Sequence, residues 1–227
     1  IIMLRGGMDG LCAIPIKGDK NFEKLRSKIN LERTLKLTSD FDLHPALKTF
    51  KSLWDQNLSA VVHATNIPYT GRSHFDGQNL MESGGKIPYQ EKTGWLGRGM
   101  KVAGLTGQGL ALALPMPLLI RGVPMNNNYF PVGRSLPYPD TLELIKQAYK
   151  EHDEKLLSDN LEIILNRDFN NRSSDDAWIL ASSAGTELSK PNGPKVAVFE
   201  VDGFDTHAAQ GATDGAHADC LSDYDNI

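Results

Sequence analysis

The sequence is poor in several features that would assign it to a class of protein at once. Only 2 of its 227 residues are cysteines, and 7% are aromatic. Cys12 and Cys220 lie near opposite ends of the chain, without the close spacing of a metal-binding cysteine motif. We interpret them as two small buried or partly buried side chains, and the count leaves one disulfide between them open.

Two further absences concern charge and hydrophobicity. The 24 basic and 28 acidic residues give a net charge of −4, and no run rich in Lys and Arg carries interleaved aromatic residues. This balance argues against a nucleic-acid partner. The longest apolar stretch, residues 110–120, contains Pro115 and Pro117 and is too short to span a bilayer as a helix. We therefore expect no nucleic-acid partner and no transmembrane segment.

The apolar residues that are present predict an α/β fold. Four near-continuous apolar runs are predicted strands, at residues 1–4, 59–65, 110–114 and 195–201. Their lack of polar alternation is typical of strands buried on both faces of a parallel sheet. Residues 46–56, which begin after Pro45, place apolar side chains at helical spacing. Strands that alternate with helices indicate a mostly parallel sheet in an α/β sandwich.

The stretch 138–189 differs from the rest of the chain. Asp140 and Glu143 form a capping-box pattern at the start of one helix, and residues 153–167 and 175–188 are two more predicted helices. Between Asp140 and Asp176, ten acidic residues oppose five basic ones. We predict a single domain over residues 1–227 with a solvated helical insertion at 138–189, and an acidic binding surface is the alternative.

Three of the predicted strand ends carry polar side chains beside glycine. Asp9 follows the first strand, and Ser73 follows the second at a position where a helix N-cap belongs. Asp205 and His207 follow the last strand, and side chains two residues apart on an extended chain point the same way. Because the carboxyl ends of parallel strands share one rim, we expect these side chains to converge.

Each of these residues also has a simpler interpretation. Asp9 alone is best explained as the cap of a turn or of the segment that follows, and Ser73 as an ordinary N-cap. The functional interpretation is a nucleophilic Ser73 hydroxyl at a helix N-terminus, where anions are favoured, with Arg72 suited to a phosphate or sulfate oxyanion. Two aspartates, a serine and a histidine together suit Zn²⁺, Mn²⁺, Mg²⁺ or Ca²⁺.

Seven motifs, taken together and in order, resemble those of a known family. They are Leu4-Arg-Gly-Gly-Met-Asp-Gly-Leu11, Leu43-His-Pro-Ala-Leu47, Ala60-Val-Val-His-Ala64, Arg72-Ser-His-Phe-Asp76, Met81-Glu-Ser-Gly84, Thr93-Gly-Trp-Leu-Gly-Arg98 and Gly203-Phe-Asp-Thr-His-Ala-Ala-Gln210. The set is similar to the bacterial family known as domain of unknown function 1501, within the alkaline phosphatase-like superfamily. The resemblance covers nearly the whole chain and is weakest over residues 138–189.

The resemblance implies a three-layer α/β/α sandwich and metal-assisted attack on phosphate or sulfate esters. The candidate catalytic residues are Ser73, Arg72 and His74, the candidate metal ligands are Asp9, Ser73, Asp205 and His207, and the candidate substrate contact is Arg98. The implied cofactor is a divalent metal, namely Zn, Mn, Mg or Ca. The spacing from Asp205 to His207 is shorter than the spacing usual in the superfamily.

The resemblance also implies export by the twin-arginine route, and thus a periplasmic or secreted location. Family members are nearly twice as long, and their C-terminal Asp-His pair and later histidine are not found here. We therefore expect a truncated chain with half of the metal ligands missing and with absent or impaired activity. Ile1 is not an initiator methionine, so we expect a processed or trimmed start from which any export signal is gone.

Three functional hypotheses follow from these residues. The leading one is a metal-dependent hydrolase of small-molecule phosphate or sulfate esters. An alternative is a metal-independent serine esterase that uses Ser73, His207 and Asp205. The third is an exported binding or assembly protein that kept the fold without turnover.

Overall fold

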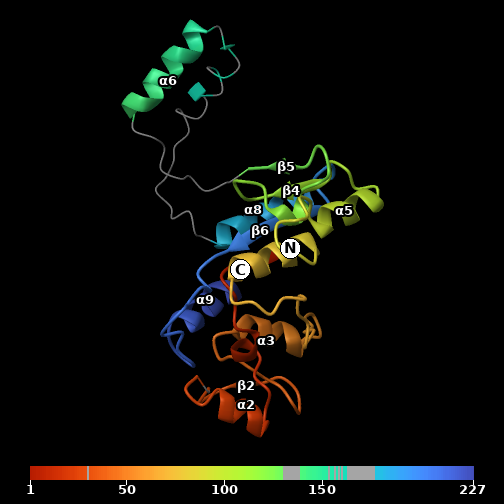
Figure 1. Cartoon of the computed structure of the whole chain (residues 1–227), viewed down its shortest axis with the longest axis vertical. Coiled ribbons are helices and arrows are strands. Elements are labelled where there is room, and N and C mark those ends of the chain that lie inside the picture. The colour runs from red at the N-terminus through yellow and green to blue at the C-terminus, as the bar shows by residue number, and fades with distance from the viewer. Residues whose placement is uncertain are drawn as a thin grey trace. The chain divides into compact units, whose positions relative to one another are not determined.

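A computed structural model describes residues 1–29, 31–129, 139–152 and 177–227, together with isolated positions between 154 and 162. The contacts of the chain divide it into two compact units (Figure 1). The first unit comprises Ile1–Tyr129 and Ala177–Ile227, and the second comprises Phe130–Asp176. Each unit is described by itself.

The first unit is built on a four-stranded parallel sheet in the order β1-β6-β4-β5. Its strands are β1 (Ile2–Leu4), β4 (Gly109–Ala111), β5 (Asn127–Asn128) and β6 (Val196–Val201). The central strand β6 pairs with β1 through Phe199 opposite Ile2 and with β4 through Ala197 opposite Leu110. The predicted α/β class with a mostly parallel sheet is confirmed, and so are three of the four predicted strands.

The predicted strand at residues 59–65 is wrong. This segment is irregular, its residues alternate between half-buried and exposed, and Val62 is 77% exposed. The backbone turns into the left-handed region at Ala64, where φ is 54°, and this interrupts an extended strand. A two-stranded antiparallel sheet, β2 (Leu35–Lys36) with β3 (Asp42–Leu43), forms instead from residues for which no strand was predicted.

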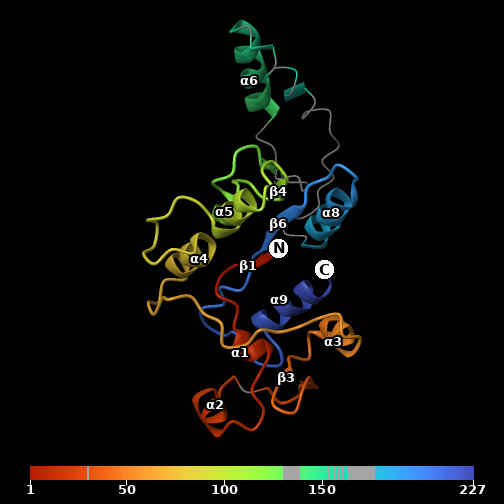
Figure 2. The ribbon, with the colours of Figure 1, turned by 90° about the vertical axis from the view of Figure 1, so that its right-hand side faces the viewer.

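The core of the first unit lies between the sheet and the short helical segments beside β4. Figure 2 shows β6 between β1 and β4, with α8 beside β6. The buried cluster consists of Met3, Met100, Ala111, Leu119, Ile120, Val123 and Val198. Burial of such side chains contributes about 1.5–3 kcal/mol each and fixes the strands that carry the site.

The helices of the first unit are α1 (Gly10–Ala13), α2 (Lys20–Leu25), α3 (Lys48–Asp55), α4 (His74–Ser83), α5 (Trp95–Val102), η1 (Leu118–Ile120), α8 (Ala177–Ser189) and α9 (Ala216–Asp225). They include three, α1, α2 and α4, that begin with a side-chain N-cap, supplied by Asp9, Asp19 and Ser73. The predicted helix at residues 46–56 is confirmed as α3, and α4 ends at Gly84 in a left-handed cap with φ of 66°.

The second unit contains α6 (Pro139–Glu151), so a helix forms where one was predicted, but Asp140 is not its N-cap as the capping-box pattern required. The helix begins at Pro139, so Asp140 lies in its first turn, where an acidic side chain favours the helix dipole. The predicted helix at 153–167 falls mostly outside the described residues. The predicted helix at 175–188 is confirmed as α8, but α8 packs against β6 and belongs to the first unit rather than to the insertion.

Candidate functional site

The pair Asp205 and His207 lies in the loop that follows β6. His207 Nε2 is 3.0 Å from Asp205 Oδ2, which confirms that the two side chains converge. The sequence argument assumed an extended backbone between the two residues. His207 instead has a left-handed backbone with φ of 46°, so the convergence does not come from extended geometry. Buried Phe204 anchors the loop, and its backbone N–H donates to the carbonyl of Arg5, at 3.2 Å.

Gly6 determines how closely this loop approaches the end of β1. A Cβ at Gly6 would lie 2.3 Å from the backbone nitrogen of Asp205, and φ of Gly6 is 105°. Any side chain there would collide with the backbone, so the residue must be glycine. Gly6 thus allows the close approach of the Asp205 loop to the chain after β1.

His74, the first residue of α4, joins the pair. Its Nε2 lies 3.5 Å from Asp205 Oδ2, and its ring meets the ring of His207 edge-on, with centroids 5.9 Å apart. We call His74, Asp205 and His207 the Asp205 cluster. A carboxylate between two imidazoles can orient them and move protons, which is general acid–base chemistry.

Ser73 caps α4, as its simpler interpretation predicted. Its Oγ accepts a hydrogen bond of 3.2 Å from the backbone N–H of Asp76. Tyr69, which the sequence argument missed, accepts from the Ser73 N–H at 3.3 Å and donates to Asp76 Oδ2 at 3.1 Å. Because Ser73 Oγ acts as acceptor in its capping bond, the hydroxyl proton is available for a base.

Asp9 caps α1, which also agrees with its simpler interpretation. Its Oδ1 accepts from the N–H of Cys12 at 3.1 Å, and its Oδ2 accepts from Gln210 Nε2 at 2.8 Å and pairs with Arg26. Burial raises the pKa of Asp9, but the hydrogen bond from Gln210 and the charge of Arg26 lower that pKa by more. Asp9 is therefore an ionised carboxylate with its partners supplied by the chain.

The four predicted metal ligands are not brought together as one set. Asp205 and His207 are adjacent, whereas Asp9 is engaged by Arg26 and Gln210, and Ser73 by Asp76. Among the residues that the structure describes, no three His, Cys, Asp or Glu side chains are arranged to hold a metal ion. The residues as they stand do not fit the implied metal centre, and the divalent metal stays a prediction.

The two candidate anion-binding arginines lie in different places. Arg72 is exposed and directly precedes Ser73. Arg98 donates to the carbonyl of Ser83 at 2.7 Å and to the carbonyl of Thr93 at 2.8 Å, so it holds the C-terminal end of α4. Since α4 has 10 residues, that end is about 15 Å from Ser73. The structure therefore does not bring Arg98 together with Ser73.

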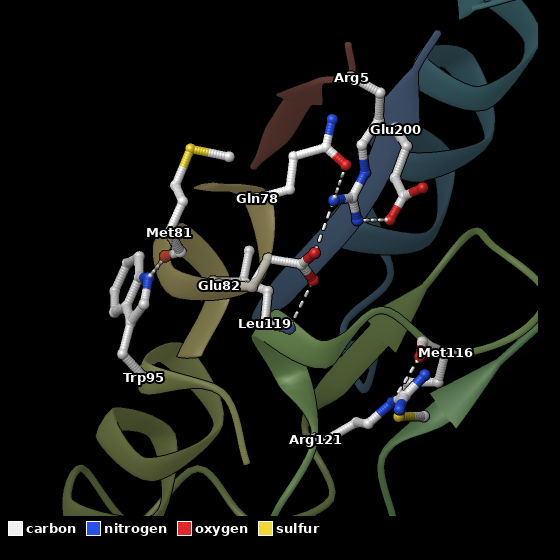
Figure 3. Close-up of polar contacts among 9 residues, drawn as sticks. All are labelled: Arg5, Gln78, Met81, Glu82, Trp95, Met116, Leu119, Arg121 and Glu200. Atoms are coloured by element: carbon white, nitrogen blue, oxygen red, sulfur yellow. Dashed lines mark hydrogen bonds and ion pairs between the residues drawn. The ribbon is translucent and has the colours of Figure 1, made fainter. Parts of the chain in front are cut away.

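Arg5 forms an ion-pair network that the sequence argument missed (Figure 3). Its guanidinium pairs with Glu82 of α4 at 2.6 Å and with Glu200 of β6. The other oxygen of Glu82 accepts from the buried N–H of Leu119 at 2.9 Å. Burial lowers the pKa of Arg5, but hydrogen bonds to Glu200 and Glu82 raise that pKa by more, so the cation persists. The sequence did contain one signal of this network. Glu200 is an acidic residue inside a mostly buried strand, and such a residue needs a cation or a hydrogen-bond donor as its partner.

The network ties together the three segments that carry the site. Arg5 follows β1 and precedes Asp9, Glu82 lies on the helix that Ser73 caps, and Glu200 lies on the strand that leads to Asp205. One guanidinium therefore fixes α4 relative to the ends of β1 and β6.

Comparison of the chain with models of known protein families, with curated proteins and with solved structures gives no match. The resemblance to the family of domain of unknown function 1501 therefore stays a prediction from motifs. In the part of the chain that the structure describes, no helix has both the length and the apolar character needed to cross a membrane.

Proposed function

We propose that this chain hydrolyses small phosphate or sulfate esters at the N-terminus of α4, within an alkaline phosphatase-like three-layer fold. The observation that carries the proposal is the Asp205 cluster, in which the carboxylate lies 3.0 Å from His207 Nε2 and 3.5 Å from Nε2 of His74, the neighbour of Ser73. The cluster includes the first residue of α4, so it supplies acid–base groups at the helix N-terminus that Ser73 caps and that Arg72 precedes in sequence.

Each residue of the proposed site would have its own role in the reaction. Arg72 and the first N–H groups of α4 would bind the ester anion. Ser73 Oγ would attack phosphorus or sulfur while an imidazole of the Asp205 cluster takes its proton. The ester bond to the leaving oxygen breaks, and the departing alcohol takes that proton. Water would then cleave the phosphorylated or sulfated serine, with the imidazole again as base.

The observed hydrogen bond between His207 and Asp205 also favours a second candidate, a metal-independent esterase for carboxylic esters. The divalent metal implied by the resemblance is a separate proposal, and no step above depends on it. A third proposal is the export implied by the same resemblance, which predicts a periplasmic or secreted protein and is tested by cell fractionation of the source organism.

The experiment measures hydrolysis of three chromogenic esters, p-nitrophenyl phosphate, sulfate and acetate, with EDTA and with added Mn²⁺ or Zn²⁺. We expect measurable turnover of the phosphate or the sulfate, at a rate impaired by the missing half of the implied metal ligands. Turnover of the acetate alone would replace the proposal with the carboxylic esterase. Loss of rate in EDTA and recovery on metal addition would establish the metal requirement.

A second arm tests the acid–base role of the cluster. His207→Gln is expected to lower kcat by about 10²–10⁴-fold, the usual contribution of a general acid or base. His152→Gln, a substitution of an exposed histidine on the other unit, serves as the matched control. No hydrolysis of any ester by the folded chain would instead favour a non-catalytic binding protein.

A further inference from the structure

The carboxylate of Asp9 is enclosed by donors from three parts of the chain. Gln210 Nε2 donates to Oδ2 at 2.8 Å, the N–H of Cys12 donates to Oδ1 at 3.1 Å, and the Arg26 guanidinium pairs with Oδ2. The side chain of Asp9 is 17% exposed and that of Arg26 is 20% exposed. This is a mostly buried ion pair with extra hydrogen bonds, the arrangement that offsets the cost of burying charge.

Arg26 makes two contacts besides its ion pair with Asp9. Arg26 is the C-cap of α2, and its N–H donates to the carbonyl of Phe22 at 3.0 Å. Its guanidinium carbon lies 5.8 Å from the centre of the Phe22 ring, within the range of a cation–π contact. The C-terminal end of α2 thus places the backbone of Arg26, and the Phe22 ring lies near its guanidinium.

The other titratable groups around Asp9 are uncharged. Burial raises the pKa of the Cys12 thiol to about 11, so the thiol stays protonated near neutral pH. Burial lowers the pKa of His217, and the neighbouring His44 and Arg26 lower it further against the opposing effect of Asp9. Asp9 and Arg26 therefore form a pair of one anion and one cation.

We propose that Arg26 is the resident cation of Asp9 and excludes a divalent metal from this carboxylate. A bound Mg²⁺ or Mn²⁺ needs a carboxylate oxygen at about 2.0–2.2 Å. Oδ2 of Asp9 already accepts from the Arg26 guanidinium and the Gln210 amide, and Oδ1 accepts from the N–H of Cys12. The metal would have to displace the guanidinium and leave it largely buried beside a second positive charge. Arg26 thereby stands where the phosphatase-like resemblance places a metal.

The test measures binding of Mn²⁺ alone to the full chain, through the electron paramagnetic resonance signal of the free ion. Its first arm needs no change at Arg26. Asp9→Asn is expected to leave the Mn²⁺ affinity of the chain within about twofold of the native value. A fall of tenfold or more would show that Asp9 already binds metal and would overturn the proposal.

The second arm removes the resident cation. Arg26→Met is expected to raise the Mn²⁺ affinity at least tenfold, and the double variant with Asp9→Asn should lose this gain. Lys24→Met, a change of an exposed lysine on α2, is the control for net charge. Equal affinities of Arg26→Met and the native chain would also overturn the proposal, because the guanidinium would not be the barrier.

Circular dichroism accompanies each variant. If Arg26→Met does not fold, Arg26→Gln replaces it, since the amide keeps hydrogen-bond donors without the charge. No ester is present in either arm, so the outcome does not depend on the proposed hydrolysis. A failure of one proposal is thus distinguishable from a failure of the other.

Discussion

At the scale of single residues, Gly6 and Gly7 offer a matched test of how the site loop is positioned. Both have positive φ, 105° and 88°, but a Cβ at Gly7 would meet nothing within 4 Å, whereas one at Gly6 would strike the backbone of Asp205. Comparison of the two glycines therefore separates the energetic cost of backbone strain from the cost of a steric collision with the loop.

We predict that Gly7→Ala lowers the free energy of unfolding by about 1–2 kcal/mol, the cost of a left-handed alanine. Gly6→Ala should cost at least about 1 kcal/mol more, because the loop at Asp205 must also move. Urea denaturation of both variants measures the difference. Equal losses would show that the close approach of the loop is not required.

His217 gives a residue-scale prediction about pH. Its side chain is 1% exposed, and neither ring nitrogen has a hydrogen-bond partner within the described residues. Burial lowers its pKa below the ordinary 6.5, so the folded chain keeps the ring neutral while the unfolded chain protonates it as pH falls. This contribution to stability is complete above pH 6.5 and is lost as pH falls toward the folded pKa.

We predict that the native chain loses more free energy of unfolding than His217→Phe between pH 7.5 and 5.5. The difference is at most about 1.4 kcal/mol, the value for one proton over one pH unit below 6.5. Chemical denaturation at both pH values measures it. The same pH dependence in both proteins would show that His217 does not titrate on unfolding.

The sequence predicted individual roles well where the cause is local. Ser73 as N-cap and Asp9 as a cap depend on the next three residues, and both are confirmed. The partners of Asp9 could not be predicted, because Arg26 and Gln210 are 17 and 201 residues away in sequence. A single sequence does not show which residues distant along the chain come into contact.

At the scale of elements, a side chain of α9 caps the N-terminus of α3. Asp225 of α9 accepts from the N–H groups of Thr49 and Phe50 at 2.6 and 2.8 Å, while Leu47 at the N-cap position of α3 offers no side-chain bond. A carboxylate at the N-terminus of a helix also favours its dipole.

We predict that Asp225→Ala lowers the free energy of unfolding by about 1–2 kcal/mol, the usual cost of losing an N-cap. Asp223→Ala, on the same helix but exposed, should change it by less than about 0.5 kcal/mol. Thermal and urea unfolding of both variants provide the comparison. A similar small effect for both would show that α3 does not depend on α9.

Element prediction succeeded where burial on both faces or a strong cap made the pattern clear. The strands β1, β4 and β6 and the helices α3, α4, α6 and α8 follow from such patterns. The segment 59–65 shows the limit, since its valines suggested a buried strand although one side of it faces solvent. A high strand propensity shows that residues suit a half-buried surface, and it does not show that they pair with another strand.

At the scale of the whole first unit, the Arg5 network joins β1, α4, β6 and η1. Arg5→Met would leave Glu82, which is 5% exposed, without its cation. We predict a loss of about 3–5 kcal/mol in the free energy of unfolding, the cost of a broken buried pair. The exposed Arg121, replaced by Met, is the control and should cost far less.

The double variant Arg5→Met with Glu82→Gln tests the cause of that loss. Replacing Glu82 by Gln removes the unpaired carboxylate. This should recover part of the lost free energy of unfolding, because the uncompensated buried charge is the main cost. No recovery would show that packing of the arginine stem, rather than its charge, stabilises the assembly of these elements.

The central claim is that Ser73, which directly precedes His74 of the Asp205 cluster, is the nucleophile of an ester hydrolase. The most direct measurement compares turnover of p-nitrophenyl phosphate and sulfate by Ser73→Asn and Ser73→Thr with that of the native chain. Both variants keep a good N-cap for α4, but only Thr keeps a hydroxyl. We predict measurable turnover with Thr and a loss of at least about 10³-fold with Asn, while both fold like the native chain. Equal turnover by both variants, or none by the native chain, would contradict the account.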